Sequence, residues 1–280
     1  MKRLVVLFLI AGTTPALSDG SPWLPADGAT SLSAELTMGS TDEFFIGDES
    51  MDLNGDIDGT FLWLNAKYGY DDVWAFDFRT GYAQTSFETD LPTNFDAPEQ
   101  EDFADTSFGV SYQFINEFEA DNGWPTITAR AGFTIGGDYE TNLIEAIGDG
   151  ASGVDLSILA GKSLTPSIAV FGDLTYRQRG SNVADGIKYL LSAYYTTTVP
   201  GLGFQAAAAG IRTDSDIDIA GPGFGVEQFP LTDRDSDWLI LGVNYGLNNG
   251  LGFGLSVASV LSGKNVADSN IGTFSLSYDF

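Results

Sequence analysis

The sequence predicts an all-β chain, in which residues 31–280 form a single antiparallel up-and-down β-barrel of about 12 strands. Segment after segment alternates large apolar residues with small or polar ones, which is the period of a β-strand. The composition suits strands and turns, with 34 Gly, 20 Phe, 11 Tyr and 5 Trp in 280 residues. The connections between the segments also alternate between short and long.

Twelve segments carry the alternation, and they set the expected order of strands. They are residues 31–41, 59–70, 73–86, 105–117, 125–136, 153–164, 168–179, 187–199, 203–213, 237–247, 250–261 and 271–280. Connections after even-numbered strands are tight, whereas those after odd-numbered strands are longer, notably residues 42–58, 87–104, 137–152 and 214–236. This sorting indicates a transmembrane barrel with both termini in the periplasm, because a soluble β-sandwich has no reason to sort its loops.

Individual strands show which face meets the surroundings. The third strand puts Trp74 and Phe76 on one face, and Asp77 and Arg79 on the other. In a membrane, lipid covers the apolar face and closure of the ring satisfies the backbone edges. The strand at 203–213 is rich in alanines, which do not show which of its faces is apolar. It is kept as a strand because a barrel with both termini on one side has an even number of strands.

The first residues read as a secretory signal peptide over 1–18. Lys2 and Arg3 precede an apolar run, residues 4–11, and a small-residue stretch then leads to a cut before Asp19. The run is far shorter than the roughly 20 residues that span a bilayer. Residues 19–30 are expected to form a short periplasmic segment before the barrel.

The last strand carries a family resemblance. Residues 272–280 alternate strictly, and their large members are Phe274, Leu276, Tyr278 and Phe280. A chain that stops on an aromatic residue in such a strand resembles the porin-like β-barrel proteins of Gram-negative outer membranes. The resemblance implies an outer-membrane location, contact with lipid and lipopolysaccharide, and a terminal strand that the barrel assembly machinery reads. No motif picks out a subfamily.

The composition excludes several classes of function. The chain has no cysteine and no histidine, so disulfide scaffolds, thiolate or imidazole metal sites and histidine-dependent catalysis are ruled out. Its net charge of −27 argues against nucleic acid as a partner. We therefore expect neither an enzyme nor a protein with a dedicated cofactor.

The polar face of the strands supplies candidates for a lumen that selects solutes. They are Lys67, Asp77, Arg79, Arg130, Asp173, Arg177, Arg179 and Lys188. Such a lumen is either a narrow water-filled pore or an interior closed by ion pairs. Arg79 and Arg130 lie mid-strand, where they must meet water or acids such as Asp77. Arg177, Arg179 and Lys188 lie near the outer mouth, where they either pair with the nearby acids Asp173 and Asp185 or attract an anionic solute or a lipopolysaccharide phosphate.

The acidic connections are weak candidates for divalent cations. Asp52, Asn54, Asp56 and Asp58 have the alternate-oxygen spacing of a calcium loop, but neither register supplies the closing glutamate. Residues 42–58 hold seven acidic and no basic residues. Calcium or magnesium is therefore expected to relieve the repulsion there, or to bridge the loops to lipopolysaccharide.

The leading functional hypothesis is a narrow, porin-like channel for small solutes. The alternative is a closed structural or adhesive barrel whose acidic outer loops bind cations, lipopolysaccharide or a partner. An autotransporter translocator is disfavoured, because only residues 19–30 precede the first strand and leave no passenger.

Replacing Phe280 with Ser should lower the amount of folded barrel in outer membranes, because it removes an interfacial aromatic and, by the resemblance, part of the assembly signal. The measurement is the heat-modifiable fraction on gels of isolated outer membranes. An unchanged folded yield would contradict the role of Phe280.

Overall fold

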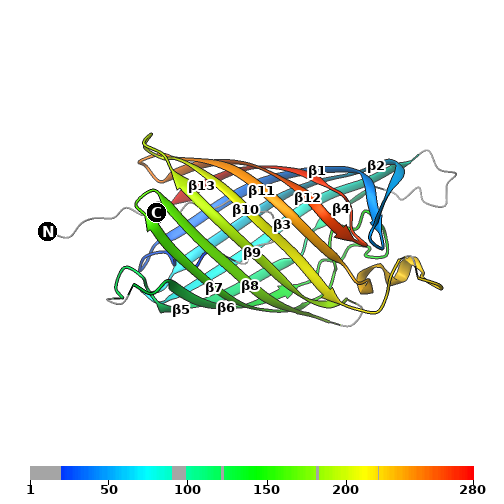
Figure 1. The fold of residues 1–280 in the computed structure, drawn as a ribbon, viewed down its shortest axis with the longest axis horizontal. Coiled ribbons are helices and arrows are strands. Elements are labelled where there is room, and N and C mark those ends of the chain that lie inside the picture. Colours follow the sequence, from blue (N-terminus) through cyan, green and yellow to red (C-terminus); the bar gives the residue numbers. More distant parts are fainter. Residues whose placement is uncertain (1–19, 90–98, 121–122, 181–182, 220) are drawn as a thin grey trace.

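The chain folds into one closed β-barrel (Figure 1). The computed structural model describes residues 20–89, 99–120, 123–180, 183–219 and 221–280, so the predicted signal peptide lies outside the described residues. No helix among these residues has the length and apolar character needed to cross a membrane.

The strands make up most of the described chain. They are β1 (Thr30–Ile46), β2 (Glu49–Gly69), β3 (Trp74–Thr89), β4 (Gln100–Phe103), β5 (Thr106–Ile115), β6 (Thr126–Ile135), β7 (Gly153–Thr165), β8 (Ile168–Arg179), β9 (Asp185–Thr196), β10 (Leu202–Asp214), β11 (Asp235–Gly246), β12 (Leu251–Lys264) and β13 (Asn270–Asp279). A short 3-10 helix, η1 (Val226–Leu231), precedes β11.

The predicted twelve-stranded ring is confirmed. Neighbouring strands pair antiparallel in chain order, β1 pairs with β13, and β3 pairs with β5. The remaining strand, β4, pairs only with β3 and lies outside the ring. At the seam, Thr30 and Phe280 exchange backbone hydrogen bonds of 2.8 and 2.9 Å, so the last residue helps to close the barrel.

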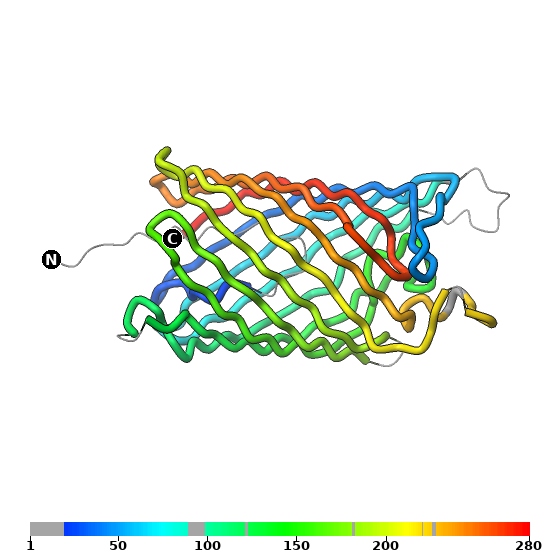
Figure 2. The backbone as a smooth tube through the Cα atoms, viewed as in Figure 1, coloured from blue at the N-terminus to red at the C-terminus, as the bar shows by residue number. Residues whose placement is uncertain are grey.

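The two ends of the barrel differ, as the sequence predicts. The tight turns gather at one end, here called the turn end, and the long connections gather at the other, the loop end (Figure 2). Both the N-terminal segment (residues 20–29) and the last residue lie at the turn end.

One predicted loop is wrong. Residues 42–58 continue β1 and β2 as a long hairpin that turns at Gly47, whose φ is 59°. The hairpin projects at the loop end, and its strand residues satisfy each other's backbone groups, so a polar sequence can stay extended without a covering membrane. The connection at 87–104 likewise contains β4.

Side chains take the faces that the alternation predicts. Leu191, Leu261 and Phe114 on the outer face expose 65%, 63% and 61% of their surface, so the outside of the ring is apolar. In β10, Ala207 and Ala209 are buried on the inner face, so the structure assigns the faces of this alanine-rich strand, which the sequence left open. Phe274, Leu276, Tyr278 and Phe280 all face outward.

The tight turns give a direct test of the fold. Gly201, between β9 and β10, has φ +80°, and a side chain there would also collide with the carbonyl of Gly246. Gly201→Ala should therefore lower the free energy of unfolding by about 1–2 kcal/mol, the cost of a left-handed backbone for an ordinary residue. Urea titration of the folded barrel in detergent measures the change. Gly272→Ala is the matched control, because nothing lies within 4 Å of the added atom, and an equal loss in both variants would contradict this account.

Candidate functional site

The inside of the ring has one charged wall and one apolar wall. The charged wall runs over β1 to β9 and includes every lumen candidate that the sequence predicted. The apolar wall follows neighbouring residues across β9 to β13, where Ile240 lies opposite both Ala207 and Ala258, and Ala258 lies opposite Ile271. Ile240 is fully buried, and Leu190 continues this wall into β9.

The predicted contact between Arg130 and Asp77 is present. Arg130 on β6 donates from Nε and Nη2 to the two carboxylate oxygens of Asp77 on β3, at 2.9 and 2.6 Å. Gly109 and Gly132 make room for this pair, because a side chain at either position would meet the guanidinium. Lys67 lies directly opposite Asp77 on β2. The pair therefore joins strands that are not neighbours and crosses the inner face of β5.

Arg79 lies against an aromatic surface that sequence reasoning missed. Its guanidinium is 4.2 Å from the centre of the Trp63 ring, and Trp63 stacks on Phe61 at 5.8 Å. An oxygen of Glu35 lies 3.8 Å from Arg79. Phe61 and Trp63 alternate with the outward residues Leu62 and Leu64, so the period of two alone could have assigned them to the lumen.

Arg179 pairs with an acid other than the two expected for this group. It donates through both terminal nitrogens to Asp155 on β7, at 3.0 and 3.2 Å, and this pair is almost fully buried. Asp185 instead accepts the backbone N–H of Arg179. Asp173 lies in the same wall, 2.9 Å from the hydroxyl of Thr175, and the Lys188 side chain is buried on β9.

The connection at residues 137–152, here called the inner loop, folds into the lumen, a position that sequence reasoning did not address. Ile147 is buried against Ala83 and Ala104, with Trp63 beside them. The inner loop therefore reaches from β6 and β7 to the opposite side of the ring. Apolar residues in a long, otherwise acidic connection were the sequence signal for this burial.

Hydrogen bonds and ion pairs hold the inner loop in place. The Tyr139 hydroxyl donates to Asp105 and accepts from the backbone of Gly150. Burial and the nearby Asp105 carboxylate raise the pKa of Tyr139 above its ordinary value, so the phenol stays protonated as a donor. Asp149 accepts from Arg177 on β8 and from Arg234, in each case at 2.7 Å.

One side chain of the inner loop, that of Glu145, disfavours burial of the loop in the lumen. Glu145 is 3% exposed, and neither carboxylate oxygen has a hydrogen-bond partner within the described part of the chain. An uncompensated buried carboxylate costs free energy. Glu145 therefore weakens the attachment of the inner loop.

The N-terminal segment enters the lumen at the turn end. The Pro22 carbonyl accepts hydrogen bonds from Gln113 and Thr128, at 3.0 and 2.6 Å. Trp23 is buried, donates its indole N–H to Glu117 at 3.0 Å and packs edge-on against Phe171. A tryptophan beside prolines, in a segment expected to lie in the periplasm, was the available signal for this position.

The metal candidates do not come together. Asp52, Asn54, Asp56 and Asp58 are exposed along β2, where alternate residues lie about 7 Å apart, too far for one ion to reach every side chain. The described residues contain no group of three or more carboxylates placed to hold a metal ion. Cation bridging by the acidic hairpin stays a prediction.

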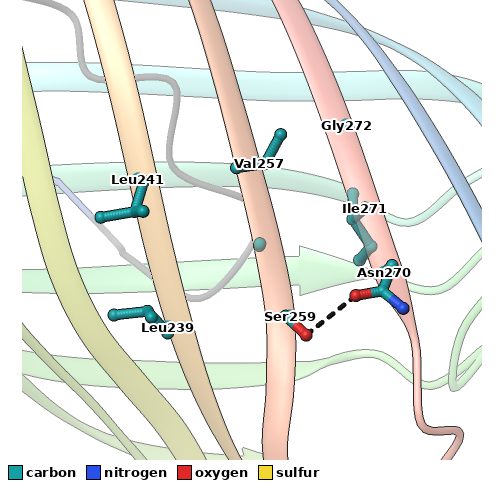
Figure 3. Close-up of a pocket in the computed structure, with 8 residues that line it drawn as sticks. Leu239, Leu241, Val257, Ser259, Asn270, Ile271 and Gly272 are labelled. Carbon is teal, nitrogen blue, oxygen red and sulfur yellow. Dashed lines mark hydrogen bonds between the residues drawn. The ribbon is translucent and has the colours of Figure 1, made fainter.

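A groove of about 410 Å³ lies on the outer face and not in the lumen (Figure 3). Leu239, Leu241 and Val257 line it, and the small Gly272 leaves it open. At its edge, Ser259 and Asn270 form a hydrogen bond of 2.8 Å. The groove is therefore off any path through the ring.

The closed twelve-stranded ring with an apolar outer face has the architecture of a transmembrane β-barrel. The chain is similar to the COG4313 outer membrane channel from Pseudomonas putida F1, with 14% identity and a TM-score of 0.74, covering 94% of this chain and 99% of that one.

Two other structures share the fold at a lower level of similarity. The KdgM porin in complex with disordered oligogalacturonate has a TM-score of 0.51 and 9% identity, covering 89% of this chain and 99% of that one. The translocator domain of the autotransporter NalP from Neisseria meningitidis has a TM-score of 0.52 and 11% identity, covering 95% and 91%. No protein-family model and no curated protein matches the chain. At such identities the likeness establishes the fold, which channels and a translocator share.

The pair formed by Arg130 and Asp77 should stabilise the ring. Arg130→Ala leaves Asp77 without its two charge-assisted hydrogen bonds, so the free energy of unfolding should fall by about 1–3 kcal/mol in urea titrations. Arg212→Ala is the control, because the Arg212 side chain is 42% exposed in its pair with Asp237, and its loss should be smaller. A loss at Arg130 no larger than at Arg212 would contradict a structural role for the lumen pair.

Proposed function

We propose that this barrel is a narrow channel through which small solutes cross the outer membrane. The observation that carries the proposal is the partial exposure of charged side chains inside the ring. The side chains of Arg79, Asp77 and Arg177 expose 22%, 21% and 19% of their surface, although they point into the lumen. Space for water therefore remains beside these charges, whereas a tightly packed interior would leave them fully buried. Twelve strands also enclose more space than the eight-stranded rings that side chains fill.

Two segments make the proposed channel narrow. The inner loop covers part of the lumen at the loop end, and the N-terminal segment covers part of it at the turn end. A solute must pass both. We place the constriction that excludes large molecules at these two segments, and we assign the choice among small solutes to the charged and apolar walls between them.

The proposal includes an orientation in the membrane. We place the loop end outside the cell and the turn end in the periplasm, because barrels of this class keep short turns on the periplasmic side. The outward Tyr68, Trp74 and Tyr245 would then lie at the periplasmic interface, and the acidic hairpin would face lipopolysaccharide. Assembly through the terminal strand belongs to the same proposal.

Ion conductance of the purified protein in planar bilayers tests the channel. The wild-type protein should show small, discrete conductance steps. Trp23→Ala should enlarge them, because it removes the indole that ties the N-terminal segment to Glu117 and Phe171. Trp124→Ala is the matched control, because Trp124 is exposed, and its steps should match the wild type.

If neither the folded wild-type protein nor the folded Trp23→Ala variant conducts ions, the channel proposal is overturned. The closed structural or adhesive barrel would then be the better account. If the conductance steps grow equally in Trp23→Ala and Trp124→Ala, the N-terminal segment is not the constriction.

A further inference from the structure

A pocket of about 200 Å³ lies at the loop end, where four separate parts of the chain meet. Its walls come from the end of β1, the inner loop, η1 with the connection after it, and the turn between β12 and β13. We call it the mouth pocket. Apolar side chains dominate its lining, among them Phe44, Leu143, Ile144, Phe229 and Val266. Asp149 and Arg234 also line it.

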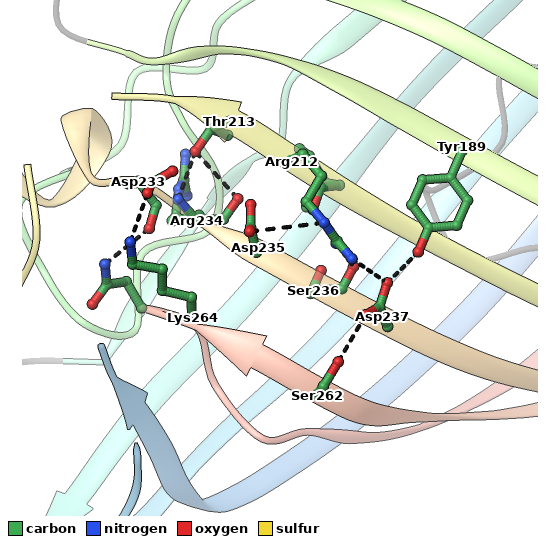
Figure 4. Close-up of polar contacts among 12 residues, drawn as sticks. Tyr189, Arg212, Thr213, Asp233, Arg234, Asp235, Ser236, Asp237, Ser262 and Lys264 are labelled. Carbon is green, nitrogen blue, oxygen red and sulfur yellow. Dashed lines mark hydrogen bonds and ion pairs between the residues drawn. The ribbon is translucent and has the colours of Figure 1, made fainter. Parts of the chain in front are cut away.

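Hydrogen bonds between its walls hold the mouth pocket in shape. Asn265 is buried with φ 52°, donates to the backbone carbonyl of Asp233 at 2.8 Å and accepts from the backbone of Gly47 at 2.9 Å. Lys264 donates to the Asp233 carboxylate at 2.7 Å (Figure 4). These contacts join the hairpin of β1 and β2, the connection before β11 and the turn after β12. The outer walls are therefore preorganised, and the inner loop supplies the remaining wall.

The charged edge of the pocket is suited to a carboxylate. Arg177 and Arg234 each direct one terminal nitrogen at a different oxygen of Asp149, at 2.7 Å. Two guanidinium groups on one carboxylate leave a surplus positive charge. In addition, the buried Nε of each arginine has no hydrogen-bond partner within the described part of the chain. Burial raises the pKa of Asp149, but Arg234 and Arg177 outweigh it and hold the pKa below its ordinary value, so Asp149 is an anion there.

We propose that the mouth pocket binds a small monocarboxylate with a compact apolar body, whose carboxylate bonds to Arg234 in place of Asp149. The apolar body lies among Leu143, Ile144 and Phe229. The volume suits a body about the size of one ring or a short alkyl chain, since a cavity of about 150 Å³ lined by apolar side chains holds benzene. Arginine favours this group because its planar fork matches the two oxygens of a carboxylate.

Exchange of the carboxylates has a consequence for the channel. Once the solute replaces Asp149, the inner loop loses its link to the wall at Arg234, and the unpartnered Glu145 already weakens its inward position. The solute therefore loosens the inner loop as it binds. This inference names the solute class of the proposed channel and rests on that function.

Calorimetric titration of the full chain in detergent with hexanoate tests the site. Hexanoate should bind, whereas acetate lacks the apolar body and hexylammonium has the wrong charge, so both should bind at least about tenfold more weakly. Equal binding of hexanoate and hexylammonium would overturn the proposal, because it would reflect apolar partition alone. Absence of binding by hexanoate would overturn it as well.

Three variants locate the binding. Arg234→Gln should weaken the binding of hexanoate about tenfold, because the charged donor is lost. Ala146→Trp should weaken this binding as well, because the indole fills the pocket. Asp149→Asn should bind hexanoate more tightly than wild type, because it removes the internal competitor. A merely structural Asp149 would give weaker binding instead, and unchanged binding would also contradict the exchange.

Arg212→Gln is the matched control. Arg212 also pairs with acids, Asp237 at 2.7 Å and Asp235 at 3.7 Å, and lies over the ring of Tyr189, and none of these three residues lines the pocket (Figure 4). It should leave hexanoate binding unchanged. Each variant is first shown to be folded by heat-modifiability on gels. Equal weakening by Arg234→Gln and Arg212→Gln would overturn the assignment.

Conductance separates this inference from the channel itself. A protein that conducts but does not bind hexanoate retains the proposed function and loses the mouth pocket as a carboxylate site. If the protein binds hexanoate and the variants change this binding as expected, but no conductance is seen, the carboxylate site is supported and the channel proposal fails.

Discussion

Closure of the backbone hydrogen-bond ladder is the constraint on which the rest of this structure depends. A strand edge left open in hydrocarbon would expose unpaired N–H and C=O groups, so all twelve strands of the ring must find a partner on each side. The seam between β1 and β13 meets this requirement down to Thr30 and Phe280. Once the ring is closed, alternate residues of every strand must share the lumen, whatever their charge.

The lumen compensates its charges by pairing across the ring and by drawing in two connecting segments. Arg130 reaches past β5 to Asp77, and Arg177 and Arg234 share Asp149 from the inner loop. The N-terminal segment supplies backbone acceptors at the other end. The result is a lumen with a charged wall, an apolar wall and a connecting segment folded in near each end.

Sequence reasoning succeeded where the information is local and failed where it is not. The alternation in 73–86 placed Asp77, Arg79 and their apolar neighbours on the correct faces, and mid-strand position predicted Asp77 as a partner of Arg130. The same reasoning treated residues 42–58 as a loop, because their polarity is that of an exposed turn, yet a hairpin supplies its own backbone partners. It also did not place the inner loop in the lumen, since the surface that buries Ile147 includes Ala83 of β3, far away in sequence.

The sequence by itself therefore determined the twelve strands of the ring, the faces of the strands with clear alternation and the sorting of short and long connections, because a period of two and a connection length can be read within a few residues. Only the tertiary structure decided that Trp23 and Asp149 lie inside the ring and that Asp149 meets Arg177 and Arg234. The physical reason is that closure of the ring brings together, across the lumen, residues from strands that are not neighbours. The free energy of a buried ion pair depends on which partner the charge meets there, and the sequence of its own strand does not specify that partner.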